Sequence, residues 1–246
     1  MRSDMARVRI GTSGWHYQHW RGPYYPQSVP PRAMLDLYAR DFETVEINNS
    51  FYRMPSSATF EAWKDATPVG FSFSVKGSRY LTHRKKLLDP QPALERLMEA
   101  VVGLGVKLGP ILFQLPPNWH CNLDRLQQFL GALPAGRRYS IECRDQSWHN
   151  REVYRLLRDH NVAFYLYELG GIRSTLEVTA DFVYVRLHGP GNKYEGDYSA
   201  GRLKSWADRI QRWKQSDLDV YFYFDNDQAG YAVKNAQELK RILAAR

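Results

Sequence analysis

The chain has 246 residues, of which 43% are apolar and 14% aromatic, and it carries a formal net charge of +8. This length and composition provide for one sizeable core, and they exclude a low-complexity chain. Because no apolar run is long enough to span a bilayer and no secretory signal opens the chain, we expect a cytoplasmic protein without membrane partners. The positive charge favours anionic partners or substrates.

The two cysteines, Cys121 and Cys143, lack the CxxC spacing of a metal site. We interpret them as reduced thiols of a cytoplasmic protein, with a disulfide between them as the alternative.

Strand-like and helix-like segments alternate along the whole chain. Alternating and β-branched runs predict strands at about residues 8–13, 44–52, 71–76, 111–115, 139–144, 162–167, 182–188 and 220–225. Apolar residues at helical spacing predict helices at about residues 32–40, from Ser56 or Ser57 onward, and at 92–102, 123–133, 153–157, 203–213 and 231–245. Residues 170–181 have little helical character.

This alternation predicts an α/β fold, specifically a single TIM-type (β/α)8 barrel that is irregular between the sixth and seventh strands. Residues 1–246 would form one domain, with residues 1–6 disordered or extended. An open doubly wound sheet is the alternative, and it usually has a glycine-rich phosphate turn after an early strand. The sequence GTSGW after the first strand is too short for GxGxxG.

Polar residues recur on one face of six predicted strands, mostly toward the carboxyl ends. In a barrel the opposite face, with Val45, Ile47, Phe73 and Val75, would contact the helices. The polar set consists of Glu46, Asn48, Ser72, Ser74, Lys76, Gln114, Glu142, Arg144, Arg186, His188, Tyr223 and Asp225. Barrel enzymes place their chemistry at this end of the strands, so we predict that these side chains form one site.

Two interpretations of the polar set remain open. In the first, carboxylates and cations neutralise one another in an internal salt-bridge network. In the second, Lys76, Arg144 and Arg186 bind an anion, Glu46 or Glu142 acts as general base, and His188 acts as acid or base. Asn48, Gln114 and Asp225 would then orient substrate groups. Asn226 is a weaker candidate because its strand parity is opposite, and Tyr194 lies on a glycine-rich loop that is a candidate lid.

No cofactor is predicted and no metal ligands are assigned. Glu46, Glu142, His188 and Asp225 offer ligand atoms for a divalent ion, but three neighbouring cations would repel it. The loop histidines show no HxxxH or HExxH spacing.

Aromatic residues are concentrated in the predicted loops after the strands. They are Trp15, Tyr17, Trp20, Tyr24, Tyr25, Trp119, Trp148, Tyr194 and Tyr198. They would either pack the loops on one another or form a stacking surface for sugars or bases.

Seven motifs follow one another along the chain: GTSGWHYQHWRGPYYP, VEINNSFYRMP, VKGSRYLTH, ILFQLPPNW, IECRDQSW, YVRLHG and YFYFDNDQAGYAVKNA. This series resembles the YecE-like family, whose function is unassigned. The resemblance implies a TIM-type barrel. Related barrels have been likened to apurinic-site endonucleases and xylose isomerases, which suggests a nucleic-acid role by analogy of fold. The chain departs from the family's FNN motif at Asp225, and the dense zinc ligands of those endonucleases find no match.

The leading hypothesis is an enzyme, hydrolase-like or isomerase-like, that acts on a phosphoester or a sugar phosphate. The second is a non-catalytic nucleic-acid-binding module that uses the basic loop from Arg79 to Lys86. The third is a salt-bridged scaffold that acts through a protein partner. The partner would accordingly be an anionic small molecule, a nucleic acid or an unidentified protein.

Overall fold

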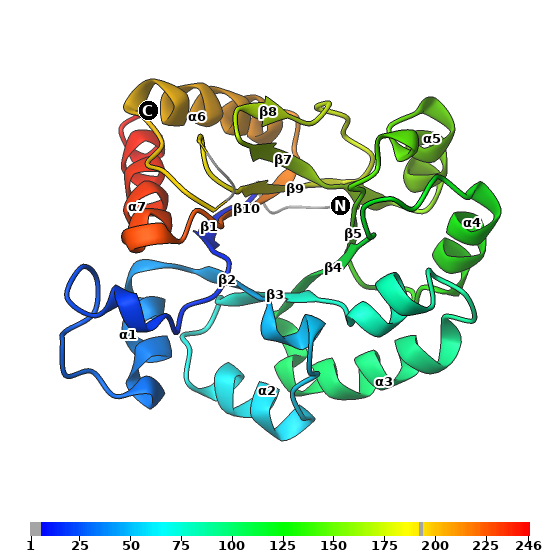
Figure 1. Cartoon of the computed structure of the whole chain (residues 1–246). Helices are drawn as coiled ribbons and strands as arrows, with labels where there is room; N and C mark the ends of the chain where they lie inside the picture. Colours follow the sequence, from blue (N-terminus) through cyan, green and yellow to red (C-terminus); the bar gives the residue numbers. More distant parts are fainter. Residues whose placement is uncertain (1–5, 192–193) are drawn as a thin grey trace. The chain divides into compact units, whose positions relative to one another are not determined.

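In the computed structural model, which describes residues 6–191 and 194–246, the chain divides into two compact units (Figure 1). The first comprises the described residues up to Glu46 together with Leu166–Ser174 and Phe182–Arg246. The second comprises Ile47–Tyr165 and Thr175–Asp181. Each unit contains its own strands and helices.

The first unit is built on a sheet with the strand order β1-β10-β9-β7-β8. Its strands are β1 (Val8–Thr12), β7 (Leu166–Leu169), β8 (Ile172–Arg173), β9 (Phe182–Leu187) and β10 (Asp219–Phe224). All pairs are parallel except β7 with β8. The helices are α1 (Met34–Asp41), α6 (Ala200–Gln215) and α7 (Tyr231–Ala244). Figure 1 shows α6 and α7 beside β9 and β10, and their apolar residues cover this sheet.

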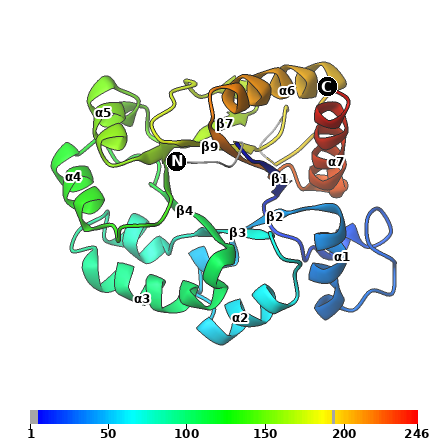
Figure 2. The same cartoon turned by 180° about the vertical axis from the view of Figure 1, so that it is seen from behind.

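The second sheet has the strand order β2-β3-β4-β5-β6, in which the pairs from β3 to β6 are parallel. Its strands are β2 (Thr44–Ile47), β3 (Ser72–Lys76), β4 (Leu108–Gln114), β5 (Tyr139–Glu142) and β6 (Val162–Phe164). The helices of the second unit are α2 (Ser57–Asp65), α3 (Gln91–Val101), α4 (Leu123–Ala132) and α5 (Arg151–Asp159). Seen from opposite sides, Figures 1 and 2 both show these helices along the outside of the strands. The boundary between the units falls within β2, after Glu46.

The predicted alternation of strands and helices with parallel pairing is confirmed, and the structure has two open sheets rather than one closed ring of eight strands. The predicted sixth strand, 162–167, is divided because β6 pairs with β5 and β7 pairs with β9. A short hairpin, β7 to β8, was not predicted. Residues 1–5 of the terminus expected to be disordered or extended lie outside the described residues. Within the described ranges, no helix has the length and hydropathy needed to cross a membrane.

The predicted second strand ends earlier than expected. The strand stops at Ile47, Asn48 adopts helical backbone angles, and residues Asn49–Phe51 form a 3-10 turn. The alternation that placed Asn48 on the same face as Glu46 therefore does not continue to Asn48, and that inference was wrong.

Candidate functional site

A buried ion-pair network lies at the carboxyl ends of the strands in the first unit. The Glu46 side chain is completely buried and accepts hydrogen bonds from Ser13 Oγ at 2.9 Å and from the Tyr184 hydroxyl at 2.5 Å. Arg186 Nε lies 3.0 Å from Glu46 Oε1, and Arg186 Nη2 lies 2.9 Å from Asp225 Oδ2. His188 Nδ1 is 2.8 Å from the same Asp225 oxygen. The structure thus brings Glu46, Arg186, His188 and Asp225 together, as their strand positions predicted.

The chemistry of this network favours mutual neutralisation. Each carboxylate has a cationic partner and hydrogen-bond donors, which is the condition under which a charge is tolerated in a protein interior. Burial, followed by the neighbouring Glu46 carboxylate, raises the pKa of Tyr184 well above its ordinary value, so the phenol keeps the proton that it donates to Glu46. Glu46 is therefore arranged to position Arg186.

A cationic cluster lies at the carboxyl ends of β3, β4 and β5 in the second unit. We use this name for Lys76, Arg79 and Arg144 with the groups between them, which are His83, Gln114 and Glu142. Arg144 Nε lies 2.8 Å from Glu142 Oε1, and Lys76 Nζ lies 4.5 Å from the centroid of the Phe51 ring. The His83 ring contacts the same phenylalanine, with 5.0 Å between centroids. Three cations surround one carboxylate, so the cluster is positively charged.

Gln114 is a polar group of the cluster whose bonding within the described residues is incomplete. It lies opposite Glu142 in the register of β4 and β5 and is 3% exposed. Its Nε2 atom is buried and, among the residues that the structure describes, has no hydrogen-bond partner. A buried amide without a partner costs about 1–3 kcal/mol, so such a group calls for a functional explanation.

The pKa of His83 reflects the positive charge of the cluster. Burial, followed by Arg144, Arg79 and Lys76, lowers the pKa of His83 to about 4, and Glu142 opposes the shift. His83 is consequently neutral at neutral pH, and its ring is hydrogen-bonded through Nδ1 to Thr82 Oγ1 at 2.9 Å. In the sequence His83 was only one of several loop histidines without a motif, because it is the fold that brings Lys76 and Arg144 near it.

We predict that Arg144→Gln raises the pKa of His83 toward the ordinary value near 6.5. The folded pKa of His83 lies below the unfolded value, so its contribution to stability is complete above about pH 6.5 and is lost as the pH falls toward 4. A pH titration of the His83 Cε1–H resonance by NMR measures the shift directly. Lys85→Gln removes a cation from the same segment that is not among the groups acting on His83, so it should leave the titration unchanged.

Two further predicted site residues, Asn226 and Tyr194, belong to the first unit. The Asn226 side chain is completely buried, and Nδ2 donates to the Gly196 carbonyl and to Asn235 Oδ1, each at 2.8 Å. Asn226 therefore fastens the glycine-rich loop to α7. The Tyr194 ring is 38% exposed and lies 5.6 Å from the His188 ring. The lid that was predicted around Tyr194 includes residues 192–193, which lie outside the described residues.

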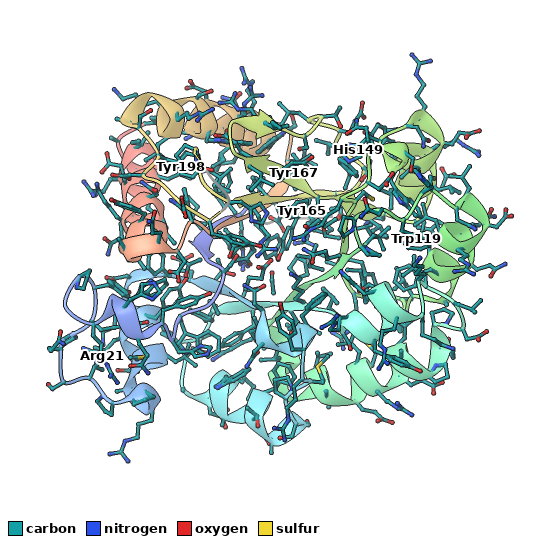
Figure 3. All side chains as sticks on the ribbon, viewed as in Figure 1. Arg21, Trp119, His149, Tyr165, Tyr167 and Tyr198 are labelled. Atoms are coloured by element: carbon teal, nitrogen blue, oxygen red, sulfur yellow. The ribbon has the colours of Figure 1, made fainter. Side chains whose placement is uncertain are left out.

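Most of the aromatic loop residues pack the loops instead of forming an open surface. Trp119, labelled in Figure 3, lies 4.9 Å from the Trp148 ring, and its carbonyl accepts a hydrogen bond from Trp148 Nε1. Buried in the same way are Trp15, Trp20, Tyr25 and Tyr198. For these residues the packing alternative holds.

Over residues 6–191 and 194–246, no three His, Cys, Asp or Glu side chains are grouped so that they could hold a metal ion. The sequence-based expectation that neither metal nor cofactor binds stays a prediction.

Comparison with known proteins places the chain in a family. The family model described as "Protein of unknown function DUF72" matches residues 9–246. The chain belongs to the DUF72 family. The predicted resemblance to YecE-like proteins is confirmed by UPF0759 protein YecE of Escherichia coli (strain K12), which is 28% identical over 111 residues, 45% of this chain and 41% of YecE. UPF0759 protein YunF of Bacillus subtilis (strain 168) is 23% identical over 96% of this chain and 94% of YunF.

Solved structures of DUF72 proteins share the fold. One from Thermotoga maritima MSB8 is 27% identical with a TM-score of 0.85, covering 97% of this chain and 99% of that one. Another, from Enterococcus faecalis V583, has a TM-score of 0.82 at 17% identity and covers 96% of this chain and 95% of that one. These DUF72 relatives establish the mixed α/β fold with parallel sheets, and their names give no activity.

Proposed function

We propose that this DUF72 protein is an enzyme that acts on an anionic substrate, a phosphoester or a sugar phosphate, bound at the cationic cluster of the second unit. The observation that carries the proposal is the buried Gln114 amide, whose Nε2 has no partner among the described residues. It lies at the edge where β3 ends at Lys76 and where Arg144 follows the end of β5. A phosphate oxygen accepts hydrogen bonds from such an amide and from cations at the same time.

The roles of the cluster follow from the chemistry of its side chains. Lys76, Arg79 and Arg144 neutralise the anion, with Arg144 offering a planar donor group and Lys76 a compact charge. Glu142, whose Oε1 is held by Arg144 Nε, accepts a proton from the attacking water in a hydrolase, or from the carbon next to the sugar carbonyl in an isomerase, where it returns the proton to the adjacent carbon. Gln114 orients the anion.

In the first unit, His188 remains a predicted acid or base, and the reaction proposed at the cationic cluster does not depend on it. Because Asp225 accepts a hydrogen bond from Nδ1 of His188, Nε2 is the nitrogen at which a proton is exchanged. Glu46 holds the Arg186 side chain in position within the same unit.

Non-catalytic binding of nucleic acid is the second candidate function. It is favoured by the exposed cations Arg79, Arg84 and Lys86, which lie in and beside the π-helical turn η4 (Tyr80–Arg84) that follows β3. Binding of this kind weakens steeply as salt rises, in proportion to the number of phosphates contacted.

The test compares the natural chain with Glu142→Gln on a panel of phosphomonoesters, phosphodiesters, sugar phosphates and single-stranded DNA. Turnover should fall at least about 100-fold in the variant, the usual contribution of a general base, while phosphate affinity is retained. Phosphate binding is measured by titration calorimetry at low salt. Failure to bind phosphate, or turnover that persists in Glu142→Gln, contradicts the proposal. Steeply salt-dependent DNA binding without turnover in either protein supports the second candidate.

A further inference from the structure

A groove with a volume of about 650 Å³ opens in the second unit, within the usual range for small-molecule sites. It is formed by the turn after β2 and by the start of α2. Its walls include two aromatic rings, Tyr52 and Trp63, together with polar groups of Asn49, Arg53, Ser56 and Thr59. The groove therefore combines flat apolar surface with hydrogen-bonding groups.

Tyr52 is unusual in this groove because it is 74% exposed. Its ring therefore buries little apolar surface and contributes little to the stability of the fold. Its backbone is nevertheless fixed, since the Tyr52 N–H donates to the Asn49 carbonyl at 3.0 Å. The ring packs edge-on against Phe51, with 5.1 Å between centroids, and the Arg79 guanidinium carbon lies 6.0 Å from its centroid. One edge is anchored while most of the ring surface stays accessible.

Side-chain contacts link the groove to the cationic cluster. Phe51, which contacts the Tyr52 ring, also lies 4.5 Å from Lys76 Nζ and 5.0 Å from the His83 ring. Arg79 belongs to the cluster and contacts Tyr52. A ligand whose anionic group binds Arg79 of the cluster can therefore place its uncharged part on the Tyr52 ring.

We propose that the groove binds the base of a nucleotide whose phosphate lies in the cationic cluster. The inference rests on the proposed function and narrows its substrate class to nucleotides. Base stacking on an aromatic side chain contributes about 1–3 kcal/mol, and it tolerates different bases because every base has a π-face. The Asn49 amide and the Thr59 hydroxyl provide hydrogen bonds for the base edge, and a sugar phosphate that lacks a base would leave Tyr52 unused.

Titration calorimetry with AMP, GMP, CMP, UMP, ribose 5-phosphate and inorganic phosphate tests the proposal. At least one nucleotide should bind about 5- to 150-fold more tightly than ribose 5-phosphate, the ratio that corresponds to the stacking free energy. Tyr52→Ala should reduce that nucleotide to the affinity of ribose 5-phosphate, which itself stays unchanged. Tyr52→Phe keeps the ring and should retain the preference. Because the side chain is exposed, both variants are expected to fold.

The outcomes separate this inference from the proposed function. Equal affinities for all four nucleotides and ribose 5-phosphate overturn the nucleotide assignment and leave an anion site in place. A nucleotide preference that survives Tyr52→Ala also overturns it. If neither phosphate, ribose 5-phosphate nor any nucleotide binds, the proposed function fails and the inference fails with it.

Discussion

Replacing Arg186 with methionine is expected to lower the free energy of unfolding by about 3–5 kcal/mol, the usual loss when one partner of a buried ion pair is removed. Arg186 is the shared cation of Glu46 and Asp225, and its side chain is 3% exposed. Without it, both carboxylates stay in the interior and lose the cation that they share. Chemical denaturation followed by tryptophan fluorescence and by circular dichroism measures the loss.

Arg173→Met is the matched control for this prediction. Arg173 Nε also pairs with a fully buried carboxylate, Glu168 Oε2, at 2.8 Å, but the Arg173 side chain is 33% exposed. Glu168 keeps Arg202 at 3.2 Å and the Trp206 Nε1 donor at 3.3 Å after the change. The loss should therefore be clearly smaller than for Arg186→Met. Equal losses, or a loss below about 1 kcal/mol for Arg186→Met, would contradict the role of Arg186 as the cation on which the network depends.

The strands were predictable because their signal is local. Alternation in Phe71–Val75 and in Phe182–Leu187 reflects side chains pointing to opposite faces, and the structure contains β3 and β9 at these positions. The division of residues 162–167 was not predictable, because the run Val162–Tyr167 is uniformly apolar. Which half joins which sheet depends on partners far away in sequence, β5 for one and β9 for the other.

The candidate site was predictable to the extent that strand position determines it. Arg186, His188 and Asp225 converge because β9 and β10 are adjacent parallel strands whose carboxyl ends meet. Asn48 was misplaced because a turn begins one residue earlier than the polar alternation suggested. Residue pattern also carries no information about hydrogen-bond satisfaction. Only the packed structure shows that both Glu46 carboxylate oxygens accept hydrogen bonds. It also shows that Gln114 Nε2 has no hydrogen-bond partner among the described residues.

The replacement of Gln114 by methionine should raise the free energy of unfolding by about 1–3 kcal/mol, because it removes a buried donor that has no hydrogen-bond partner among the described residues. Methionine has a similar length and adapts to the apolar walls of a core. The same change should weaken phosphate binding about 10-fold to 150-fold, the equivalent of a hydrogen bond to a charged group. Stability and binding are thus expected to move in opposite directions.

Asn226→Met makes the same kind of change at a buried amide whose donors are partnered, and it should destabilise the protein, since the Gly196 carbonyl and Asn235 Oδ1 lose their donor. The contrast separates a polar group kept for the fold from one kept for a ligand. Denaturation curves measure the stability of both variants, and phosphate titrations measure their affinity for the anion. If Gln114→Met destabilises the protein as Asn226→Met does and leaves the phosphate affinity unchanged, Gln114 stabilises the fold and does not bind the anion. A more stable protein that has lost phosphate would mean that the unsatisfied Gln114 amide is retained at the expense of stability because the bound anion is its partner.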